Sequence, residues 1–267
     1  MLNDNFGRKL TYLRVSVTDR CNLRCTYCMP ERGVELLKHD KILTYSQITD
    51  FVKVAVSNGI SKVRITGGEP LVRRGISILI GELSGIEGIK DLSLTTNGQL
   101  LASMAKELKD AGLHRVNISL DTVDPKRYEE ITRGGNIDRV FEGIAQAKAV
   151  GLSPIKINCV VEKNSGEKDA SEVAAFAARE GLSVRFIKIM DLKTGEFGIV
   201  EGGDGGNCSA CNRLRLTATG ILKPCLFNDA GYDIIALGAQ KAIMLAAGNK
   251  PLKGGCNNSG NFYNIGG

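Results

Sequence analysis

The sequence predicts an α/β protein whose parallel sheet curls into a partial (β/α)6 TIM-like barrel. Six short β-branched runs alternate with amphipathic stretches, and a glycine follows several of those stretches. A length of 267 residues also suits one large core. Alternating strands and helices give parallel strands with right-handed crossovers. Eight such units would close a full barrel, so six predict an open one.

The expected strands are β-branched runs, several of which interleave a cation with aliphatic residues. They cover Tyr12–Val17, Lys62–Thr66, Asp91–Thr95, Arg115–Leu120, Ile155–Val161 and Ser183–Ile189. The expected helices show apolar residues at helical spacing. One of them begins at Thr44, with Gln47 placed for a capping box. The others cover Ile76–Leu83, Leu101–Ala111, Arg139–Val150 and Lys168–Glu180. The glycines expected to end helices are Gly112, Gly151 and Gly181.

The pattern changes after Met190, so we expect a barrel at 1–191 and a C-terminal extension at 192–267. The extension begins with a flexible Gly-rich link that includes Glu201–Asn207. A hairpin is then expected from strands at Arg213–Thr217 and Ile221–Cys225. A helix-like stretch follows at Ile234–Ala247, and an irregular tail at Lys253–Gly267.

Composition excludes several classes of protein. The net charge of +6, from 35 Lys+Arg against 29 Asp+Glu, is too small and too scattered to indicate nucleic-acid binding. No apolar run approaches the ~20 residues that cross a bilayer, and the N-terminus lacks the apolar region of a signal peptide. Six of the eight cysteines fall into two groups with metal-like spacing. This predicts a reducing, cytoplasmic location, with Cys159 as a core thiol.

The first cysteine group has the spacing C-x3-C-x2-C and consists of Cys21, Cys25 and Cys28, with Tyr27 directly before the last cysteine. Three thiolates can hold three irons of a [4Fe–4S] cluster and leave the fourth iron open to bind and reduce a ligand. Zinc sites more often read C-x2-C with a second pair or histidines, and neither of the two histidines is spaced to complete one. The motif is typical of radical S-adenosylmethionine (SAM) enzymes.

The second group has the spacing C-x2-C-x13-C and consists of Cys208, Cys211 and Cys225. It could bind zinc with Cys256 as a fourth ligand, or a second [4Fe–4S] cluster with one free iron, and spacing alone leaves both open. Arg213 and Arg215 alternate beside this group and would share one face of the hairpin. Two guanidinium groups there favour an anionic or heteroaromatic ligand.

Cations occupy strand positions where a barrel would normally place aliphatic residues. They are Arg14, Lys62, Arg64, Lys156 and Arg185. If the neighbouring aliphatic residues face the helices, these cations point into the lumen. Buried like charges need anions, and a polyphosphate would supply them. Alternatively, each cation lies at a strand end and reaches water.

Polar residues at the ends of other strands extend this candidate site. Gly67 and Gly68 would let the backbone approach a ligand closely, and the adjacent Glu69 could take an ammonium group. Further polar residues could bind a ribose or base, or only satisfy local backbone groups, and these are Ser93, Thr95, Asn117, Ser119 and Asn158.

Together these motifs resemble the MoaA family, radical SAM lyases that act as GTP 3′,8-cyclases in molybdenum cofactor biosynthesis. The resemblance rests on LRVSVTDRCNLRCTYCMP, VRITGGEPLVRR, LTTNG, RVNISLD, VRFIKIMD, the second cysteine group and a terminal Gly-Gly. It covers Leu13–Asp191 and Cys208–Phe227, and more loosely Asn261–Gly267. Between Asp191 and Cys208 the family carries a much longer segment. The lid over the substrate would therefore be thinner here, or be supplied by another chain.

The resemblance implies two [4Fe–4S] clusters, the first held by Cys21, Cys25 and Cys28 and the second by Cys208, Cys211 and Cys225. SAM would be contacted by Tyr27, Gly68, Ser119 and Met190, to which the GGE motif adds Gly67 and Glu69. GTP would be bound by Arg14, Lys62, Arg64, Thr95, Lys156, Arg213 and Arg215, with Arg185 as a further candidate. Arg213 and Arg215 would also serve catalysis, and Gly266 and Gly267 would reach into the active site.

In the implied reaction, an electron from the first cluster cleaves SAM to methionine and a 5′-deoxyadenosyl radical. This radical removes hydrogen from C3′ of GTP, and the C3′ radical attacks C8 of the guanine. The resemblance also implies an electron donor such as flavodoxin or ferredoxin, product transfer to a cyclic pyranopterin synthase, and a possible homodimer. Two alternatives stay open. One is a radical SAM relative acting on another nucleotide or on a peptide, and the other is a non-catalytic zinc-binding module.

Overall fold

A computed structural model describes residues 1–258 and 265 of the chain. Among these residues, one nine-stranded sheet has the strand order β6-β5-β4-β3-β2-β1-β7-β8-β9. Its strands are β1 Tyr12–Ser16, β2 Lys62–Thr66, β3 Asp91–Thr96, β4 Arg115–Ser119, β5 Lys156–Val161, β6 Ser183–Lys188, β7 Arg213–Leu216, β8 Ile221–Lys223 and β9 Tyr232–Asp233. The prediction for Gly266 and Gly267 lies outside the described residues.

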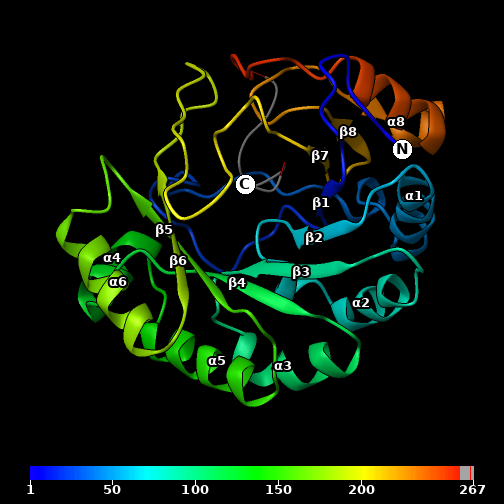
Figure 1. Cartoon of the computed structure of the whole chain (residues 1–267). Coiled ribbons are helices and arrows are strands. Elements are labelled where there is room, and N and C mark those ends of the chain that lie inside the picture. The colour runs from blue at the N-terminus through cyan, green and yellow to red at the C-terminus, as the bar shows by residue number, and fades with distance from the viewer. Residues whose placement is uncertain (259–264, 266–267) are drawn as a thin grey trace.

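The helices α1 to α6 lie between the parallel strands along the chain, with both α4 and α5 between β4 and β5, and they cover the outer side of the curved sheet (Figure 1). The helices are α1 Tyr45–Ser57, α2 Ile76–Ser84, α3 Leu101–Asp110, α4 Pro125–Thr132, α5 Ile137–Ala149, α6 Lys168–Arg179, α7 Ile234–Leu237 and α8 Ala239–Gly248, with short 3-10 turns at His39–Lys41 and Pro70–Val72. Strands β1 to β6 pair in parallel, which confirms the partial barrel. No helix within 1–258 and 265 is long and apolar enough to cross a membrane.

The core lies between the sheet and the helices. On β1, for example, Leu13 and Val15 are fully buried in the same cluster as Ile48 and Phe51 of α1. The predicted capping box starts α1, because Gln47 N donates to Thr44 Oγ1 and Thr44 N donates to Gln47 Oε1. Since the aliphatic residues of the strands face the helices, the cations between them face the other side of the sheet.

Three features differ from the sequence-based expectation. Helix α4 was not predicted, because its eight residues carry too few apolar positions to show a helical period. The helix expected at Ile234–Ala247 is divided into α7 and α8 at Gly238, which has a positive φ of 78°. The predicted hairpin is present, but β7 also pairs in parallel with β1, so the C-terminal region continues the barrel sheet.

The Gly-rich link between β6 and β7 follows the free edge of β6. Phe186 and Glu201 exchange two backbone hydrogen bonds of 3.0 and 3.1 Å, and Asp191 pairs with Glu196. A Cβ at Gly202 would lie 2.4 Å from the Val184 carbonyl oxygen, so a side chain there would force the link away from β6. This short segment is therefore attached to β6, the edge strand of the barrel, at one isolated bridge, where the sequence indicated only a flexible connection.

Candidate active site

The parallel strands surround one cavity of about 580 Å³ on the side of the sheet that carries the cations. Every residue that the sequence analysis assigned to SAM, to GTP or to one of the two clusters lines it, namely Arg14, Cys21, Cys25, Tyr27, Cys28, Lys62, Arg64, Gly67, Gly68, Glu69, Thr95, Ser119, Lys156, Arg185, Met190, Cys208, Cys211, Arg213, Arg215 and Cys225. Their individual roles remain predictions. Ser93 and Asn117 instead bond within the sheet, to Arg64 Nε and to the Leu94 carbonyl oxygen.

The first cysteine loop is docked on the C-terminal end of α4. The Ile131 and Thr132 carbonyl oxygens accept the backbone N–H groups of Thr26 and Arg24, at 2.9 and 3.2 Å. Arg133 Nη1 then donates to the Arg24 and Met29 carbonyl oxygens, at 3.0 and 2.9 Å. The helix that the sequence analysis missed thus fixes the path of the C-x3-C-x2-C loop.

Glu69 joins the turn after β2 to the first cysteine. Its carboxylate accepts hydrogen bonds from Leu71 N, Thr96 Oγ1 and Asn97 N, at 3.0, 2.8 and 2.7 Å. The Asn97 side-chain amide in turn donates to Cys21 Sγ at 3.8 Å. Burial raises the pKa of Glu69 to about 7, although these three donors act against the rise. Glu69 therefore braces the cysteine loop, and its predicted contact with a SAM ammonium group remains a prediction.

The three thiols of the first group lie close enough to affect one another. Burial raises the pKa of Cys25 to about 12, and the nearby Asp121, Cys28 and Cys21 add to the rise. Burial and Cys21 raise the pKa of Cys28 to about 11. Thiols so reluctant to ionise in the apoprotein become thiolates on a metal, which deprotonates its sulfur ligands. All three are free cysteines, so the donor set fits a three-cysteine [4Fe–4S] site.

Tyr27 is held in place by Asp121, which follows β4. The Tyr27 hydroxyl donates to Asp121 Oδ2 at 2.7 Å, and the other carboxylate oxygen accepts Val160 N at 2.8 Å. Burial raises the pKa of Asp121 to about 6, against the effect of these hydrogen bonds. The Tyr27 ring, which lies between Cys25 and Cys28 in the sequence, is thereby fixed to the end of β4 and to β5.

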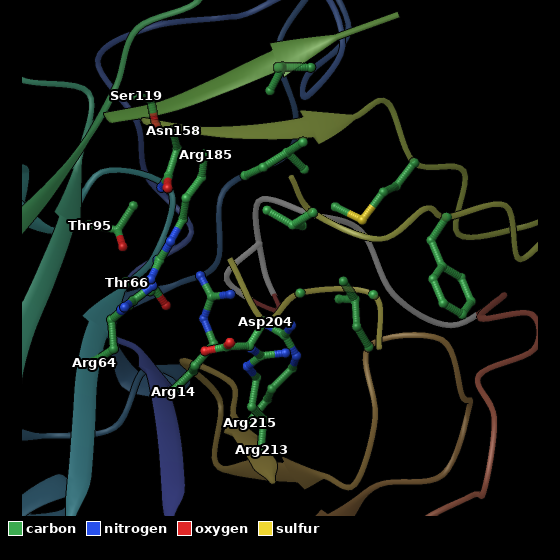
Figure 2. A pocket seen from close by; sticks show the side chains of 18 of the residues that line it. Arg14, Arg64, Thr66, Thr95, Ser119, Asn158, Arg185, Asp204, Arg213 and Arg215 are labelled. Atoms are coloured by element: carbon green, nitrogen blue, oxygen red, sulfur yellow. The ribbon is translucent and has the colours of Figure 1, made fainter. Parts of the chain in front are cut away.

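Three arginines stand in register on three adjacent strands. Arg14 of β1 is paired with Arg64 of β2 on one side and with Arg215 of β7 on the other. Figure 2 shows these side chains, with Arg185 and Arg213, directed into the same cavity. Burial and the neighbouring Arg215 lower the pKa of Arg14 to about 9, and burial with nearby guanidinium groups also lowers that of Arg64 to about 9. Because arginine stays charged in proteins, this row is suited to an anion.

The Tyr12 ring lies near two of the arginines that line the cavity. Its centroid is 5.3 Å from the Arg64 guanidinium and 5.7 Å from the Arg213 guanidinium, so the ring face offsets some of the repulsion between these two groups. Three buried polar atoms on the cavity wall have no hydrogen-bond partner within the described part of the chain: Tyr12 Oη, Thr95 Oγ1 and Arg185 Nε. Such atoms are suited to a polar ligand.

The second cysteine group lies on the same cavity, beside β7. Burial alone would raise the pKa of Cys211, but Lys250, Arg213 and Arg215 together lower it. Cys256 is exposed, whereas Cys211 and the other two members of the group are half-buried. No three His, Cys, Asp or Glu side chains in 1–258 and 265 converge to hold a single metal ion. A cubane binds each thiolate at a different iron, so its ligands need not converge on one point.

Several cavity residues were missed by sequence reasoning. They are Tyr12, Asn97, Asp204 and Lys250. Asn97 belongs to the LTTNG motif, which was noted only as part of the resemblance. Asp204 comes from the Gly-rich link, lines the same cavity as the arginines, and lies close enough for its charge to act on Arg185. No spacing rule could find Asp204 or Lys250, because each enters the cavity from an irregular segment.

Replacing Gly68 with alanine tests how tightly the turn after β2 packs on the cysteine loop. A Cβ at Gly68 would lie 2.3 Å from the Arg20 carbonyl oxygen, a backbone atom that cannot move without displacing Cys21. We expect Gly68→Ala to lose most of the iron of the first group and most SAM cleavage, measured per chain after anaerobic reconstitution.

Gly81→Ala is the matched control, because a Cβ there meets nothing within 4 Å inside α2. It should keep wild-type iron content and gain about 0.5–1 kcal/mol of stability. Normal iron binding by Gly68→Ala would contradict the packing that places the turn against the loop.

Comparisons with known proteins agree with this site. The radical SAM superfamily model matches residues 15–177. The chain is 43% identical to the GTP 3′,8-cyclase of Thermodesulfovibrio yellowstonii, over 87% of each chain. It is 41% identical to that of Peptoclostridium acidaminophilum, over 88% of this chain and 86% of the relative. The first alignment spans 279 positions although it covers 87% of this 267-residue chain, so that relative carries residues that are lacking here.

Solved structures show a likeness of fold. Streptococcus suis SuiB bound to precursor peptide SuiA superposes with a TM-score of 0.68 at 17% identity, over 92% of this chain. The match covers 66% of SuiB, so the chain spans slightly less than two thirds of that protein. SuiB bound to S-adenosylmethionine superposes with a TM-score of 0.62.

Proposed function

Because the chain belongs to the GTP 3′,8-cyclase family of radical SAM enzymes, we propose that it converts GTP to (8S)-3′,8-cyclo-7,8-dihydroguanosine 5′-triphosphate in molybdopterin biosynthesis. SAM and a [4Fe–4S] cluster are its cofactors. Family membership decides against the non-catalytic zinc-binding module that the sequence alone left open.

The observation that carries the proposal is the arginine row of Arg64, Arg14 and Arg215, which lies in the same cavity as both cysteine groups. Like charges on adjacent strands destabilise a sheet unless an anion lies between them. A triphosphate supplies several negative charges and can accept bidentate hydrogen bonds from guanidinium groups. A neutral peptide would supply none of these negative charges.

The chain's own residues bind and align the reactants. Cys21, Cys25 and Cys28 would hold the SAM cluster, and Tyr27 and Gly68 would shape the wall beside it. The cluster and SAM, when bound there, would supply the radical chemistry that the side chains of the chain cannot perform. The arginine row holds the triphosphate, and this attachment fixes the ribose relative to the SAM side of the cavity. Alignment of this kind supplies much of the rate enhancement when a cofactor performs the bond cleavage.

A second [4Fe–4S] cluster on Cys208, Cys211 and Cys225 is part of the proposal. Support comes from the position of Arg215, which is buried and lies beside Arg213, Cys225 and Cys211. A cluster with three thiolates carries net negative charge and so compensates the two arginines. The guanine would meet its open iron, as the family resemblance implies. Cys256, exposed and outside the cavity lining, is left without a role in this proposal.

Anaerobic incubation with SAM, a reductant and one nucleoside triphosphate at a time tests the substrate. We expect 5′-deoxyadenosine and a cyclised nucleotide from GTP, and no cyclised product from ATP, CTP or UTP. Equal 5′-deoxyadenosine formation with all four nucleotides and no cyclised product would refute GTP as the substrate. It would favour another substrate for the same radical chemistry.

The remaining sequence-based expectations stay predictions. They are the division into 1–191 and 192–267, an electron donor such as flavodoxin or ferredoxin, transfer of product to a cyclic pyranopterin synthase, a cytoplasmic location and a homodimer.

The link between β6 and β7 supplies part of the cavity wall, because Phe197, Val200 and Asp204 line the cavity directly. This supports a substrate site whose lid comes from the same chain.

A further inference from the structure

Lys250 is a buried lysine that comes two residues after the end of α8 and lies against the second cysteine group. It is 2% exposed and lines the cavity. Burying an ammonium group costs several kcal/mol unless hydrogen bonds and nearby negative charge compensate for the lost water. The groups that accept hydrogen bonds from Lys250 or lie near its charge therefore indicate its role.

The Lys250 ammonium group joins two separate backbone segments. It donates to the Arg213 carbonyl oxygen at 2.8 Å and to the Pro224 carbonyl oxygen at 2.7 Å. Arg213 comes two residues after Cys211, and Pro224 directly precedes Cys225. One side chain thus holds together the two parts of the hairpin region that carry these cysteines.

An ammonium group has three N–H donors, and two of them are used by these carbonyl oxygens. The ammonium charge also lies close enough to Cys211 and Cys225 to interact with both thiols. Lys250 therefore places a positive charge beside the sulfur atoms and also binds the backbone that carries them.

The position of Lys250 is fixed by the N-terminal segment. Arg8 donates to the Pro251 carbonyl oxygen at 2.7 Å and to the Cys208 carbonyl oxygen at 2.5 Å. Asp4 holds the Arg8 guanidinium in a buried ion pair. The first cysteine of the group and the residue after Lys250 are thereby tied to one point, which holds the backbone of Lys250 beside the cysteine group.

We propose that Lys250 is a positioning residue of the second cysteine group, which holds Cys211 and Cys225 in place and stabilises the reduced, more negative state of the cluster bound there. The inference rests on the proposed second [4Fe–4S] cluster. Hydrogen bonds to cluster sulfurs and nearby charge set the reduction potentials of such clusters, and outer partners of the ligands tune them. Loss of the positive charge makes reduction harder.

The test compares Lys250→Met with Lys241→Met, a control on the exposed side of α8 that removes the same charge from the chain. Iron per chain is measured in both. The midpoint potential of the second cluster is measured by redox titration with electron paramagnetic resonance. For that titration each variant is placed in a full-length chain whose Cys21, Cys25 and Cys28 are all alanine, so that only the second cluster contributes.

We expect Lys250→Met to lose iron from the second cluster only, or to keep it at a more negative potential, while Lys241→Met matches the parent chain. If Lys250→Met is insoluble, Lys250→Gln takes its place, because its amide can donate to a carbonyl oxygen but carries no charge. Unchanged iron and potential, or equal loss of iron from both clusters, would overturn the inference. A wild-type chain that binds only one cluster would refute the second cluster itself, and this inference with it.

Discussion

Cys25→Ala is expected to abolish SAM cleavage, because the loop then offers two thiolates where the cluster needs three. Cys25 lies between the other two ligands in the sequence, and both of them are close enough to raise the pKa of its thiol. The nearby carboxylate of Asp121 is not available to replace the thiolate, since it is engaged with Tyr27 and Val160. The measurement is 5′-deoxyadenosine formed per chain with dithionite as the reductant, together with iron content.

Cys159→Ala is the matched control for this variant. Cys159 is fully buried in the core and does not line the cavity, so its thiol should affect stability alone. We expect SAM cleavage by Cys159→Ala to equal that of the wild type. Persistent SAM cleavage by Cys25→Ala would contradict the assignment of the first cysteine group.

Arg213→Ala and Arg215→Ala are expected to separate SAM cleavage from product formation. Each removes charge-assisted hydrogen bonds to a bound triphosphate, worth about 1.5–3 kcal/mol, or roughly 10- to 100-fold in the KM for GTP. SAM binds on the opposite side of the cavity in this account. The variants should therefore still form 5′-deoxyadenosine while the yield of cyclised nucleotide falls.

The matched control is Arg139→Ala, which removes an exposed guanidinium from α5 on the outer side of the barrel. It should leave both products unchanged. If Arg213→Ala and Arg215→Ala lose 5′-deoxyadenosine and cyclised nucleotide in equal proportion, the arginines serve the SAM site or the fold, and their role in holding the triphosphate is wrong.

The barrel and the cations in its lumen could be predicted because local periodicity encodes them. Alternation on β1 puts Leu13 and Val15 toward the helices, and this alone directs Arg14 to the other face. The same alternation in Arg213–Leu216 correctly placed Arg213 and Arg215 on one face. Strand bounds differ from the expected ones by at most two residues at either end.

The parts that could not be predicted depend on contacts between distant segments. Periodicity shows that Arg213–Leu216 is a strand, but nothing in it shows that the strand would join β1 in parallel and align Arg215 with Arg14. Similarly, Arg133 and Lys250 donate hydrogen bonds to backbone carbonyl oxygens of other segments. Every residue has such an oxygen, so the sequence does not show which one a side chain will contact. Side chains that position ligands are therefore harder to find than the ligands themselves.

In the proposed function, one cavity aligns the ribose of GTP with the radical formed at the first cysteine group. An anaerobic reaction of SAM and a reductant with GTP that carries deuterium at the ribose C3′ position tests this alignment. We expect 5′-deoxyadenosine to gain one deuterium as the cyclised nucleotide forms. Unlabelled 5′-deoxyadenosine accompanying the consumption of this GTP would show that the hydrogen atom does not come from C3′ and that the proposed alignment is wrong.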